Sequence, residues 1–582
     1  MHRALLIPDV QAYLFANIKD DKQTGQCTLA MLARTCSVLS ETSLDALWSD
    51  LDILWPLARC IYMANTTPLS DESTPEANNN SEPDLSVFYK YAHRVHTLDI
   101  SQQWTYLRPH NGSRSRYDVM DDFFALIYYA IPSPILPNLR QLIWTPEMSL
   151  NLLHHLLNPH LRSLEIYRST QESTLFALNK LPRLCPEITS LRLHIPPWDG
   201  YPEPESLVQS YISRVICCWE KLEELDCNPT IREDVLLLCG LPSLRILRLE
   251  ITHKSVANLP SHSLTFPSLH TLQFKSDSLK TAIALMGAIK SSLKSVTIDA
   301  FVFLYSSELI EVLLHLLSRD ASRYGLQYLS MNFPGPYIMG PDSVNVSDIL
   351  RPLFLCELRI LRLAMNLQLT LGDDGLCMMA AAWPRLEKLE LIDPRPHALV
   401  SSPLLIPGLD HPNQPPQPPL PMPPAGSIQA TQPQLPQPPV QVNTNSPFES
   451  PISTEFHSPV FRVGPGLHAT TFHGLISLLE LCPRLHYFDL NIDASKLDCL
   501  QGDKPGGGVC NRLVKRAKLI DSPVGDPEVV ARILLDILPE LDSLAGENAL
   551  SLDPPHDVAY QGWIAVHQIM VASKHATNRA QA

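Results

Sequence analysis

Apolar residues return along the chain in a six-residue pattern, Leu-x-x-Leu-x-Leu. Strict copies of the pattern start at Leu244, Leu358 and Leu386. The first copy along the chain is the looser Val95-x-x-Leu98-x-Ile100. Looser copies have their apolar positions at Leu139/Leu142/Trp144, Leu161/Leu164/Ile166, Ile188/Leu191/Leu193, Leu222/Leu225/Cys227, Leu269/Leu272/Phe274, Leu293/Val296/Ile298, Leu326/Leu329/Met331 and Leu485/Phe488/Leu490. The alternation at the end of each copy predicts a short strand with one buried face.

The spacing of these copies, roughly 22–34 residues, is typical of leucine-rich repeats. We therefore predict an α/β fold, an irregular leucine-rich-repeat solenoid with parallel strands on the concave face and helices on the convex face. A proline precedes many copies, as in Leu241-Pro242-Ser243 and Trp383-Pro384-Arg385, and would end the convex helix. Asp373 and Asp374 are expected to cap one such helix. Solenoids present long concave surfaces to partners, which indicates a binding function.

The first sixty residues follow a different pattern, with apolar residues at helical spacing in three short segments. Pro8 fits the first turn of the first helix, where its missing N–H has no consequence. Three such helices bury little surface, so the unit is expected to be marginal alone and to be stabilised by docking. The whole predicted chain is a small all-α domain followed by the solenoid.

Changes in composition give the expected domain boundaries. Residues 66–84 are almost devoid of apolar side chains, and residues 401–459 are rich in proline and glutamine, which favours extended polyproline II over a packed core. We expect a helical domain at 1–60, a flexible polar loop at 61–90, the repeat solenoid at 91–400, a disordered Pro/Gln-rich insert at 401–462, C-terminal repeats at 463–550, and a capping helix and tail at 551–582.

Composition excludes several classes of protein. The net charge of −15 argues against general nucleic-acid binding, which favours a basic face. Thirteen cysteines without a C-x-x-C pair indicate free thiols in a reducing compartment. No apolar run reaches the roughly 18 residues needed to cross a bilayer, and the apolar N-terminal stretch is too short for a secretory signal. We expect a cytoplasmic and/or nuclear protein without membrane contact.

The sequence offers no catalytic constellation. It contains no G-x-x-x-x-G-K-[ST], H-E-x-x-H or G-x-S-x-G motif. The glycine-rich stretch 502–508 is interpreted as a loop, and the adjacent His154 and His155 would point to different sides of a helix without further ligands. We therefore expect no enzyme activity, no cofactor and no metal.

Two further segments leave alternatives open. The basic cluster Arg512–Lys518 (RLVKRAK) is compatible with a nuclear-import signal or a patch for an acidic partner, but the solvated face of a short helix is favoured. The polyproline tract is compatible with docking to SH3-like or WW-like grooves, and a plain spacer is the commoner meaning of such composition.

The N-terminal segment resembles the F-box-like domain of many fungal proteins. The resemblance rests on Leu6-Ile7-Pro8-Asp9-Val10, Leu14-Phe15-x-x-Ile18, Leu29-x-x-Leu32-Ala33-Arg34-Thr35-Cys36 and the ending Ala46-Leu47-Trp48-x-x-Leu51. Followed by leucine-rich repeats, it resembles the substrate receptors of Skp–cullin–F-box ubiquitin ligases. The resemblance implies a Skp-type adaptor, and through it a cullin, as partners.

The same resemblance implies an apolar surface that packs against the adaptor. The residues expected on it are Leu6, Ile7, Pro8, Leu14, Phe15, Leu32, Leu47 and Trp48. The alternative is that Trp48 and Leu51 only join the helical segment to the first repeat. An unknown protein target would contact variable strand positions, such as Arg245 and Arg248, Arg359 and Arg362, or Lys388 and Glu390. The rival functions are a stand-alone repeat scaffold and, more remotely, an enzyme with an unrecognised site.

Overall fold

A computed structural model describes most of the predicted helical and repeat regions. The described residues are 7–21, 23–65, 84–101, 116–145, 150–167, 180–194, 215–228, 232–257, 259, 264–300, 310, 312, 314, 317, 325–333, 344–365, 369–392, 470–497, 506–519, 523–544 and 558–581. The described residues up to 392 and from 470 onward form one compact unit, called the first unit. The insert expected at 401–462 lies outside the described residues.

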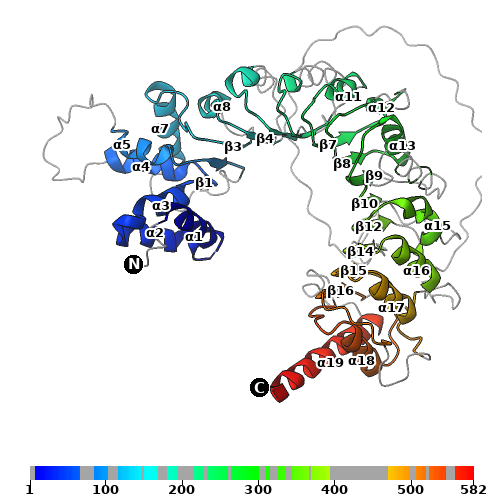
Figure 1. Cartoon of the computed structure of the whole chain (residues 1–582). Coiled ribbons are helices and arrows are strands. Elements are labelled where there is room, and N and C mark those ends of the chain that lie inside the picture. Colours follow the sequence, from blue (N-terminus) through cyan, green and yellow to red (C-terminus); the bar gives the residue numbers. More distant parts are fainter. Residues whose placement is uncertain are drawn as a thin grey trace, which may run out of the picture. The chain divides into compact units, whose positions relative to one another are not determined.

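One parallel sheet of fourteen strands runs through the first unit, and the strands follow one another in chain order (Figure 1). The strands are β1 (Asp50–Leu51), β2 (Thr97–Asp99), β3 (Gln141–Trp144), β4 (Ser163–Tyr167), β5 (Ser190–His194), β6 (Glu224–Cys227), β7 (Ile246–Ile251), β8 (Thr271–Ser276), β9 (Ser295–Ala300), β10 (Tyr328–Phe333), β12 (Ile360–Met365), β14 (Lys388–Ile392), β15 (Tyr487–Asp489) and β16 (Arg516–Lys518). Two short strands, β11 (Val344–Asn345) and β13 (Leu369–Thr370), pair separately. This arrangement confirms the predicted α/β solenoid.

The apolar positions of the hexads form the core. In β7, Leu247 and Leu249 are buried while Arg248 between them faces the other side of the sheet. Leu247 is in register with Leu225 of β6 and Leu272 of β8, so each leucine packs on its equivalents in the neighbouring repeats. Burying one such side chain contributes roughly 1.5–3 kcal/mol, and the core grows by one layer with each repeat.

A second column of residues lies three positions before the hexads, and in several repeats its side chain donates a hydrogen bond to the preceding repeat. The indole Nε1 of Trp219 donates to the carbonyl of Cys185 (2.9 Å), and that of Trp383 donates to the carbonyl of Leu353 (3.2 Å). Asn158 Nδ2 donates to the carbonyls of Leu136 and Leu139, and Asn511 Nδ2 to that of Leu485. These bonds satisfy buried carbonyls in turns that contain no regular ladder.

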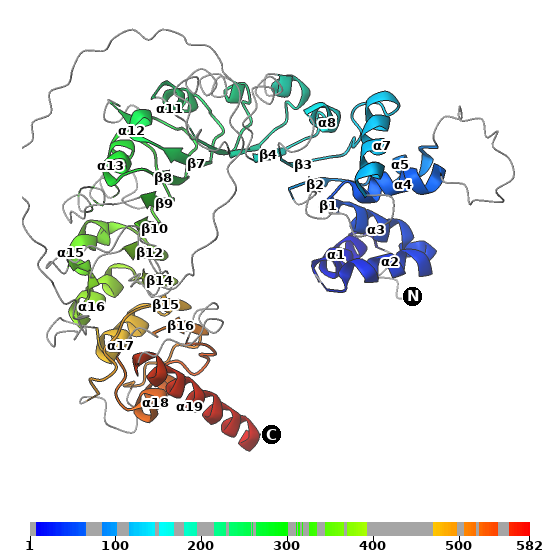
Figure 2. The same cartoon turned by 180° about the vertical axis from the view of Figure 1, so that it is seen from behind.

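The described helices of the repeats cover one face of the sheet, and none of them lies on the other face, here called the open face (Figures 1 and 2). They include α8 (Leu150–Leu156), α11 (Arg232–Leu238), α12 (His253–Val256), α13 (Leu279–Ala288), α15 (Val346–Leu350) with the 3-10 turn η3 (Arg351–Leu355), α16 (Asp373–Ala382), α17 (Phe472–Leu481) and α18 (Pro527–Ile537). The last helix, α19 (Val558–Gln581), packs on α18, and its Lys574 Nζ donates to the carbonyl of Leu541 (2.7 Å).

The expected capping role of Asp373 is corrected in one respect. The N-cap of α16 is Gly372, and the Asp373 carboxylate instead accepts from the Thr471 N–H (2.6 Å), the Thr471 hydroxyl (2.7 Å) and the Gly474 N–H (3.1 Å). Asp373 therefore supports the N-terminus of α17, whose N-cap is Thr471, in the next repeat on the other side of the insert in sequence.

The N-terminal region departs from the expected boundaries. Helices α1 (Pro8–Asp20), α2 (Gly25–Thr35) and α3 (Ser37–Trp48) are followed at once by β1, so the sheet begins at Asp50 and not near residue 91. The expected loop at 61–90 is shortened by α4 (Trp55–Asn65) and α5 (Ser86–Ala92), and residues 66–83 lie outside the described residues. Helix α7 (Arg116–Tyr129) follows β2.

Candidate protein-interaction surfaces

The first candidate surface belongs to helices α1, α2 and α3, which contact one another. Pro8 occupies the first turn of α1, as expected. Phe15 of α1 and Leu29 of α2 are the apolar side chains buried among the described residues of these helices, and neither belongs to the apolar core of the repeats. Their burial contributes roughly 3–6 kcal/mol, whereas ordering each backbone residue costs about 1–2 kcal/mol. The three-helix unit therefore depends on its neighbours.

The eight residues expected to bind an adaptor do not share one environment. Leu6 lies outside the described residues. Ile7, Pro8 and Leu14 are exposed, and Leu32 and Leu47 are partly buried. Phe15, with 5% exposure, is buried within the folded chain. We therefore remove Phe15 from the candidate contact surface.

Trp48 also has an internal partner. Its indole stacks on the ring of Tyr91 from α5, with centroids 4.3 Å apart and planes at 18°. Trp48 packs against the core of the repeats, and Leu51 is buried in that core as part of β1. For these two residues the geometry matches the alternative interpretation, in which they join the helical unit to the first repeat.

Sequence reasoning missed part of the exposed apolar surface. Tyr13 of α1 and Met31 of α2 are exposed by 71% and 59%, and Val38 of α3 is exposed as well. Met31 follows the buried Leu29 by two positions, which places it about 200° away around the helix, on the outer side. We group these side chains with Ile7 and Leu14, which are also exposed on the three-helix unit, under the name apolar helix surface.

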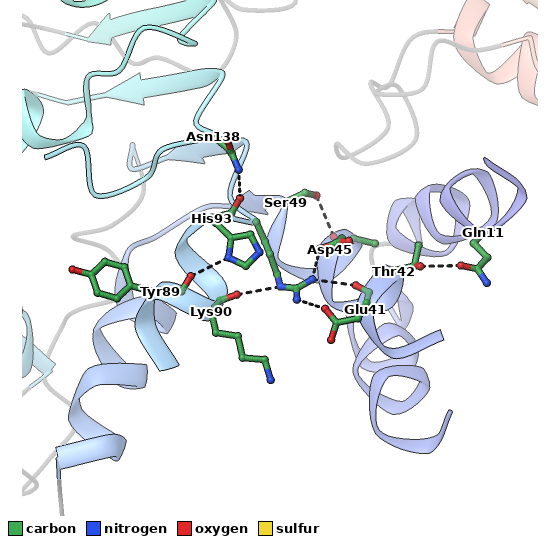
Figure 3. Close-up of polar contacts among 11 residues, drawn as sticks. Gln11, Glu41, Thr42, Asp45, Ser49, Tyr89, Lys90, His93 and Asn138 are labelled. Atoms are coloured by element: carbon green, nitrogen blue, oxygen red, sulfur yellow. Dashed lines mark hydrogen bonds and ion pairs between the residues drawn. The ribbon is translucent and has the colours of Figure 1, made fainter. Parts of the chain in front are cut away.

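A buried arginine joins the three-helix unit to the repeats, and Figure 3 labels its partners Glu41, Asp45 and Lys90. Arg94, at the end of α5, has a side chain only 5% exposed and forms ion pairs with the carboxylates of Glu41 and Asp45 on α3. It also donates to the carbonyls of Glu41 and Lys90, both at 3.2 Å. Burial lowers the pKa of Arg94, but the hydrogen bond to Glu41 and the charges of both carboxylates outweigh that effect and raise it. The guanidinium thus remains charged between the two parts.

Two more contacts complete this junction. The carbonyl of Ser49 accepts from the N–H groups of His96 (2.8 Å) and Thr97 (2.9 Å), which begin the parallel pairing of β1 with β2. Lys19 of α1 donates to the Ser49 hydroxyl (2.6 Å) and to Asp50 (2.5 Å). Helix α1 therefore contacts the first strand through Lys19, α3 leads directly into that strand, and α2 is connected to it through its contacts with α3.

The second candidate surface is the open face of the sheet, on which the variable hexad positions lie in rows. In the N-terminal half of the sheet, the Arg192 guanidinium of β5 pairs with the carboxylates of Glu165 on β4 (N···O 3.5 Å) and Glu224 on β6 (2.9 Å). Arg248 of β7 pairs with Glu224 as well and donates to Gln273 of β8 (2.9 Å). These ion pairs run across four repeats and connect side chains that are distant in sequence.

Aromatic residues flank this network. Tyr167 stacks on His194 with centroids 4.8 Å apart, and His194 lies 3.3 Å from Glu165. The hydrogen bond to Glu165, with burial, raises the pKa of Tyr167 to about 12, so its hydroxyl remains protonated. Burial raises the pKa of the nearby Asp226 carboxyl. The arrangement can offer hydroxyl and carboxylate groups to a protein partner.

A second polar cluster occupies the open face near the end of the sheet. Glu390 of β14 is buried between Arg362 of β12 (3.2 Å) and Lys388 (2.8 Å). Lys518 of β16 lies 3.5 Å from Asp489 of β15. The Lys388 ammonium is 4.8 Å from the ring centroid of Tyr487, and burial with the charge of Asp489 raises the pKa of Tyr487 to about 12.

The basic segment Arg512–Lys518 takes part in this cluster, and its expected helical structure is wrong. Residues Arg516–Lys518 form β16, with Ala517 buried and Arg516 and Lys518 on the open face. Val514, Ala517 and Leu519 are all buried and form a repeat hexad that the sequence reading did not include. Alternation within a strand, and not a helix face, therefore exposes the cations.

The variable positions expected to contact a target divide into two groups. Arg248, Arg362, Lys388 and Glu390 lie within the two clusters of the open face. Arg245 and Arg359 lie one position before their strands and form ion pairs with Glu223 (3.6 Å) and Glu387. These last pairs follow the edge of the sheet at the strand N-termini.

Sites for small ligands are not indicated in the parts of the chain that the structure describes. No group of three or more His, Cys, Asp or Glu side chains there could hold a metal ion. His155 contacts the Ser133 hydroxyl (2.7 Å) from α8. In the glycine-rich loop the Gly506 N–H donates to Asp536 (3.0 Å), so a carboxylate of the chain already occupies that donor. No described helix is long and apolar enough to cross a membrane.

Fold and surfaces together define a leucine-rich-repeat solenoid with an N-terminal three-helix unit. No protein-family model matches the sequence, and no curated protein matches it. Among solved structures, an internalin from Listeria monocytogenes is similar at 18% identity over 46% of this chain and 70% of that chain, with a TM-score of 0.24. The yeast Rad7 and Elc1 complex is similar at 13% identity over 71% of this chain and 84% of that chain, with a TM-score of 0.33. These values assign no family.

Proposed function

We propose that this chain is a non-catalytic substrate-recognition subunit of a Skp–cullin–F-box-type ubiquitin ligase. The three-helix unit, which resembles a fungal F-box-like domain, would bind a Skp-type adaptor and through it a cullin. The repeats would bind a protein target. The chain would form and break no bonds, and its contribution would be proximity, because it holds target lysines near a conjugating enzyme.

The observation that carries the proposal is the apolar helix surface on a unit that is fixed to the repeats. Ile7, Tyr13, Leu14, Met31 and Val38 are exposed on helices that bury only Phe15 and Leu29 among their described apolar residues. Exposed apolar side chains on a small unit that buries few of its own are expected to contact a partner. The Arg94 junction then gives a bound target a defined position relative to the adaptor.

The proposed setting is a reducing compartment, the cytoplasm and/or the nucleus. The twelve cysteines of the described residues are all free thiols. Cys185 and Cys482 occupy the column before the hexads, and burial raises the pKa of each thiol to about 12. Such thiols act as small apolar side chains of the core.

Co-purification with a Skp-type adaptor tests the proposal. We expect the wild-type chain to retain the adaptor. In the double variant Leu14→Asp, Met31→Asp, the affinity for the adaptor should fall by about tenfold or more, because one buried anchor contributes roughly 1.5–3 kcal/mol. Tyr129→Asp is the matched control, because Tyr129 of α7 is 91% exposed and lies outside the apolar helix surface. Equal recovery from wild type and the double variant would overturn the proposal.

A stand-alone repeat scaffold is the second candidate, and the Trp48–Tyr91 stack favours it. In that case the three helices serve only to cover the first strand of the sheet, as terminal caps of solenoids do. The two functions differ in one outcome. A scaffold would not retain the adaptor even as the wild-type chain, whereas both functions predict that the Leu14→Asp, Met31→Asp variant keeps its target.

A further inference from the structure

Charges on the open face are separated along the sheet. From β2 to β9 the described strand residues of this face carry more carboxylates than cations. The acidic ones are Asp99, Glu165, Glu224, Asp226, Glu250 and Asp299, and the basic ones are Arg192, Arg248 and Lys275. Strand β10 follows with the uncharged Tyr328, Ser330 and Asn332. Carboxylates therefore predominate on the open face from β2 to β9, and β10 carries no charge there.

Beyond β10 the sign of the excess is reversed. The strands β12, β14, β15 and β16 carry four cations on the open face, Arg362, Lys388, Arg516 and Lys518, against two carboxylates, Glu390 and Asp489. Strand pairing puts Arg362 beside Glu390, Glu390 beside Asp489, and Asp489 beside Lys518. These four residues form one row across the strands. The two carboxylates lie side by side and buried in its middle, with Arg362 and Lys518 on either side of them. The preceding row, Lys388–Tyr487–Arg516, contains the other two cations.

The cations of this cluster surround Tyr487. Lys388 and Arg516 are its neighbours in the same row. Burial and the charges of Asp489 and Glu390 raise the pKa of Tyr487, and the charges of Arg516 and Arg362 act in the opposite direction with less effect. Because the pKa of Tyr487 is raised to about 12, the hydroxyl is a hydrogen-bond donor at neutral pH. The Tyr487 hydroxyl can therefore donate to an anionic group that is held by the neighbouring cations Lys388 and Arg516.

We propose that the open face of β12, β14, β15 and β16 is the docking surface for an acidic segment of a protein partner, with Arg362, Lys388, Tyr487, Arg516 and Lys518 as its contacts. The anionic groups are the carboxylates of Asp and Glu or the phosphates of modified Ser and Thr. This inference deepens the proposed function, because it names the chemistry of the target, but it concerns the repeats alone.

A protein segment fits this cluster better than a nucleic acid. Glu390 and Asp489 are buried in the middle of the row, where they would repel a continuous line of phosphates. The excess of two positive charges suits a short acidic stretch. The acidic excess from β2 to β9 and the net charge of −15 also disfavour a long polyanion.

Fluorescence anisotropy with the full-length chain and no adaptor tests the inference. The probes are labelled ten-residue peptides of Glu and Gly, of phosphoserine and Gly, and of Lys and Gly, together with a single-stranded DNA of ten nucleotides. The variant is Arg516→Glu with Lys518→Glu. The control is Lys254→Glu with Lys280→Glu, which makes the same change of net charge at exposed positions of α12 and α13, on the helix-covered face.

We expect the acidic peptides to bind the wild type and the control equally, and the open-face variant about tenfold more weakly, because reversal replaces each attraction with a repulsion. Arg362→Gln with Lys388→Gln, which removes charge without reversing it, should weaken binding to a smaller extent.

Tighter binding of the phosphoserine peptide would identify phosphates as the anionic groups of the partner. Absence of acidic-peptide binding, equal loss in the control, or binding of DNA in preference to both acidic peptides would overturn the inference. Variants of the apolar helix surface leave this assay unchanged, so the two proposals fail separately.

Discussion

The indole of Trp48 stacks on the ring of Tyr91, and this contact joins the last turn of α3 to α5. The two residues are separated in sequence by β1, α4 and a segment outside the described residues. Offset aromatic pairs add about 0.5–1.5 kcal/mol beyond the apolar area they bury. Trp48 is thus part of the connection between the helical unit and the repeats, and the same connection contains Arg94.

Replacing Trp48 with alanine should destabilise the N-terminal part of the chain. Because the indole is only partly buried, we expect a loss of about 2–3 kcal/mol, below the 3–5 kcal/mol typical of a fully buried tryptophan. Thermal unfolding followed by circular dichroism measures the effect, with Tyr129→Ala as an exposed aromatic control. An unchanged midpoint for Trp48→Ala would show that the stack contributes nothing to stability.

Replacing Arg94 with methionine should loosen the junction while leaving the repeats folded. The substitution removes a nearly buried cation and its hydrogen bonds to α3, for which we expect a loss of roughly 1.5–3 kcal/mol. Arg385→Met removes the exposed pair with Glu357 (3.2 Å) and should change stability by less than about 1 kcal/mol. Hydrogen exchange of α1 to α3 distinguishes local loosening from global unfolding. Equal exchange in both variants would contradict the role assigned to Arg94.

The contribution of Arg94 should depend on pH. The hydrogen bond from Arg94 lowers the pKa of Glu41 below its ordinary value of 4.5. A carboxyl group with a lowered pKa in the folded state stabilises that state above its unfolded pKa, and the effect is lost as the pH falls through the folded pKa. The stability difference between wild type and Arg94→Met should therefore be constant near pH 7 and shrink below about pH 4.5. A difference that grows on acidification would contradict this assignment.

Replacing Asp373 with alanine should weaken the attachment of α17 to α16. The carboxylate accepts from two N–H groups and one hydroxyl of the α17 N-terminus, so the loss should reach the upper part of the 0.5–2 kcal/mol typical of helix caps. Deleting residues 401–462 should leave the unfolding midpoint unchanged, and Asp373→Ala should lower it equally in the deleted and the full chain. A deletion that itself lowers the midpoint would show that the insert stabilises the repeats.

Much of the fold could be predicted because each hexad is a local signal. Every copy identified in the sequence forms a strand, and Leu247 and Leu361 occupy the buried positions expected of them. The first strand, β1, and the last strand, β16, were missed for local reasons. Trp48, which precedes β1, also fits the helical pattern of α3 and conceals the start of the strand. In β16 the only apolar residue, Ala517, is a weak signal between the cations Arg516 and Lys518. Strand pairing was needed to recognise both.

The surfaces could be predicted only in part, since they depend on contacts between distant residues. Nothing near Trp48 indicates that Tyr91 covers it, and Met31 shows its exposure only once Leu29 is known to be buried. The separation of charge on the open face requires the register of strands contributed by different repeats. Arg362 and Lys518 flank Glu390 and Asp489 in one row of the sheet, but they lie on opposite sides of the insert in sequence.

The column of indoles before the hexads gives a last prediction. Trp383→Phe keeps most of the apolar ring but removes the Nε1–H that donates to the carbonyl of Leu353. A buried carbonyl left without its donor costs about 1–3 kcal/mol, so the unfolding midpoint should fall. Phe472→Leu, at a buried position without a polar atom, is the comparison for loss of ring volume alone. Hydrogen exchange should rise in η3 and α16 for Trp383→Phe but not for Phe472→Leu. If both variants protect these elements equally, the hydrogen bonds between repeats are dispensable and apolar stacking alone sets the stability of the solenoid.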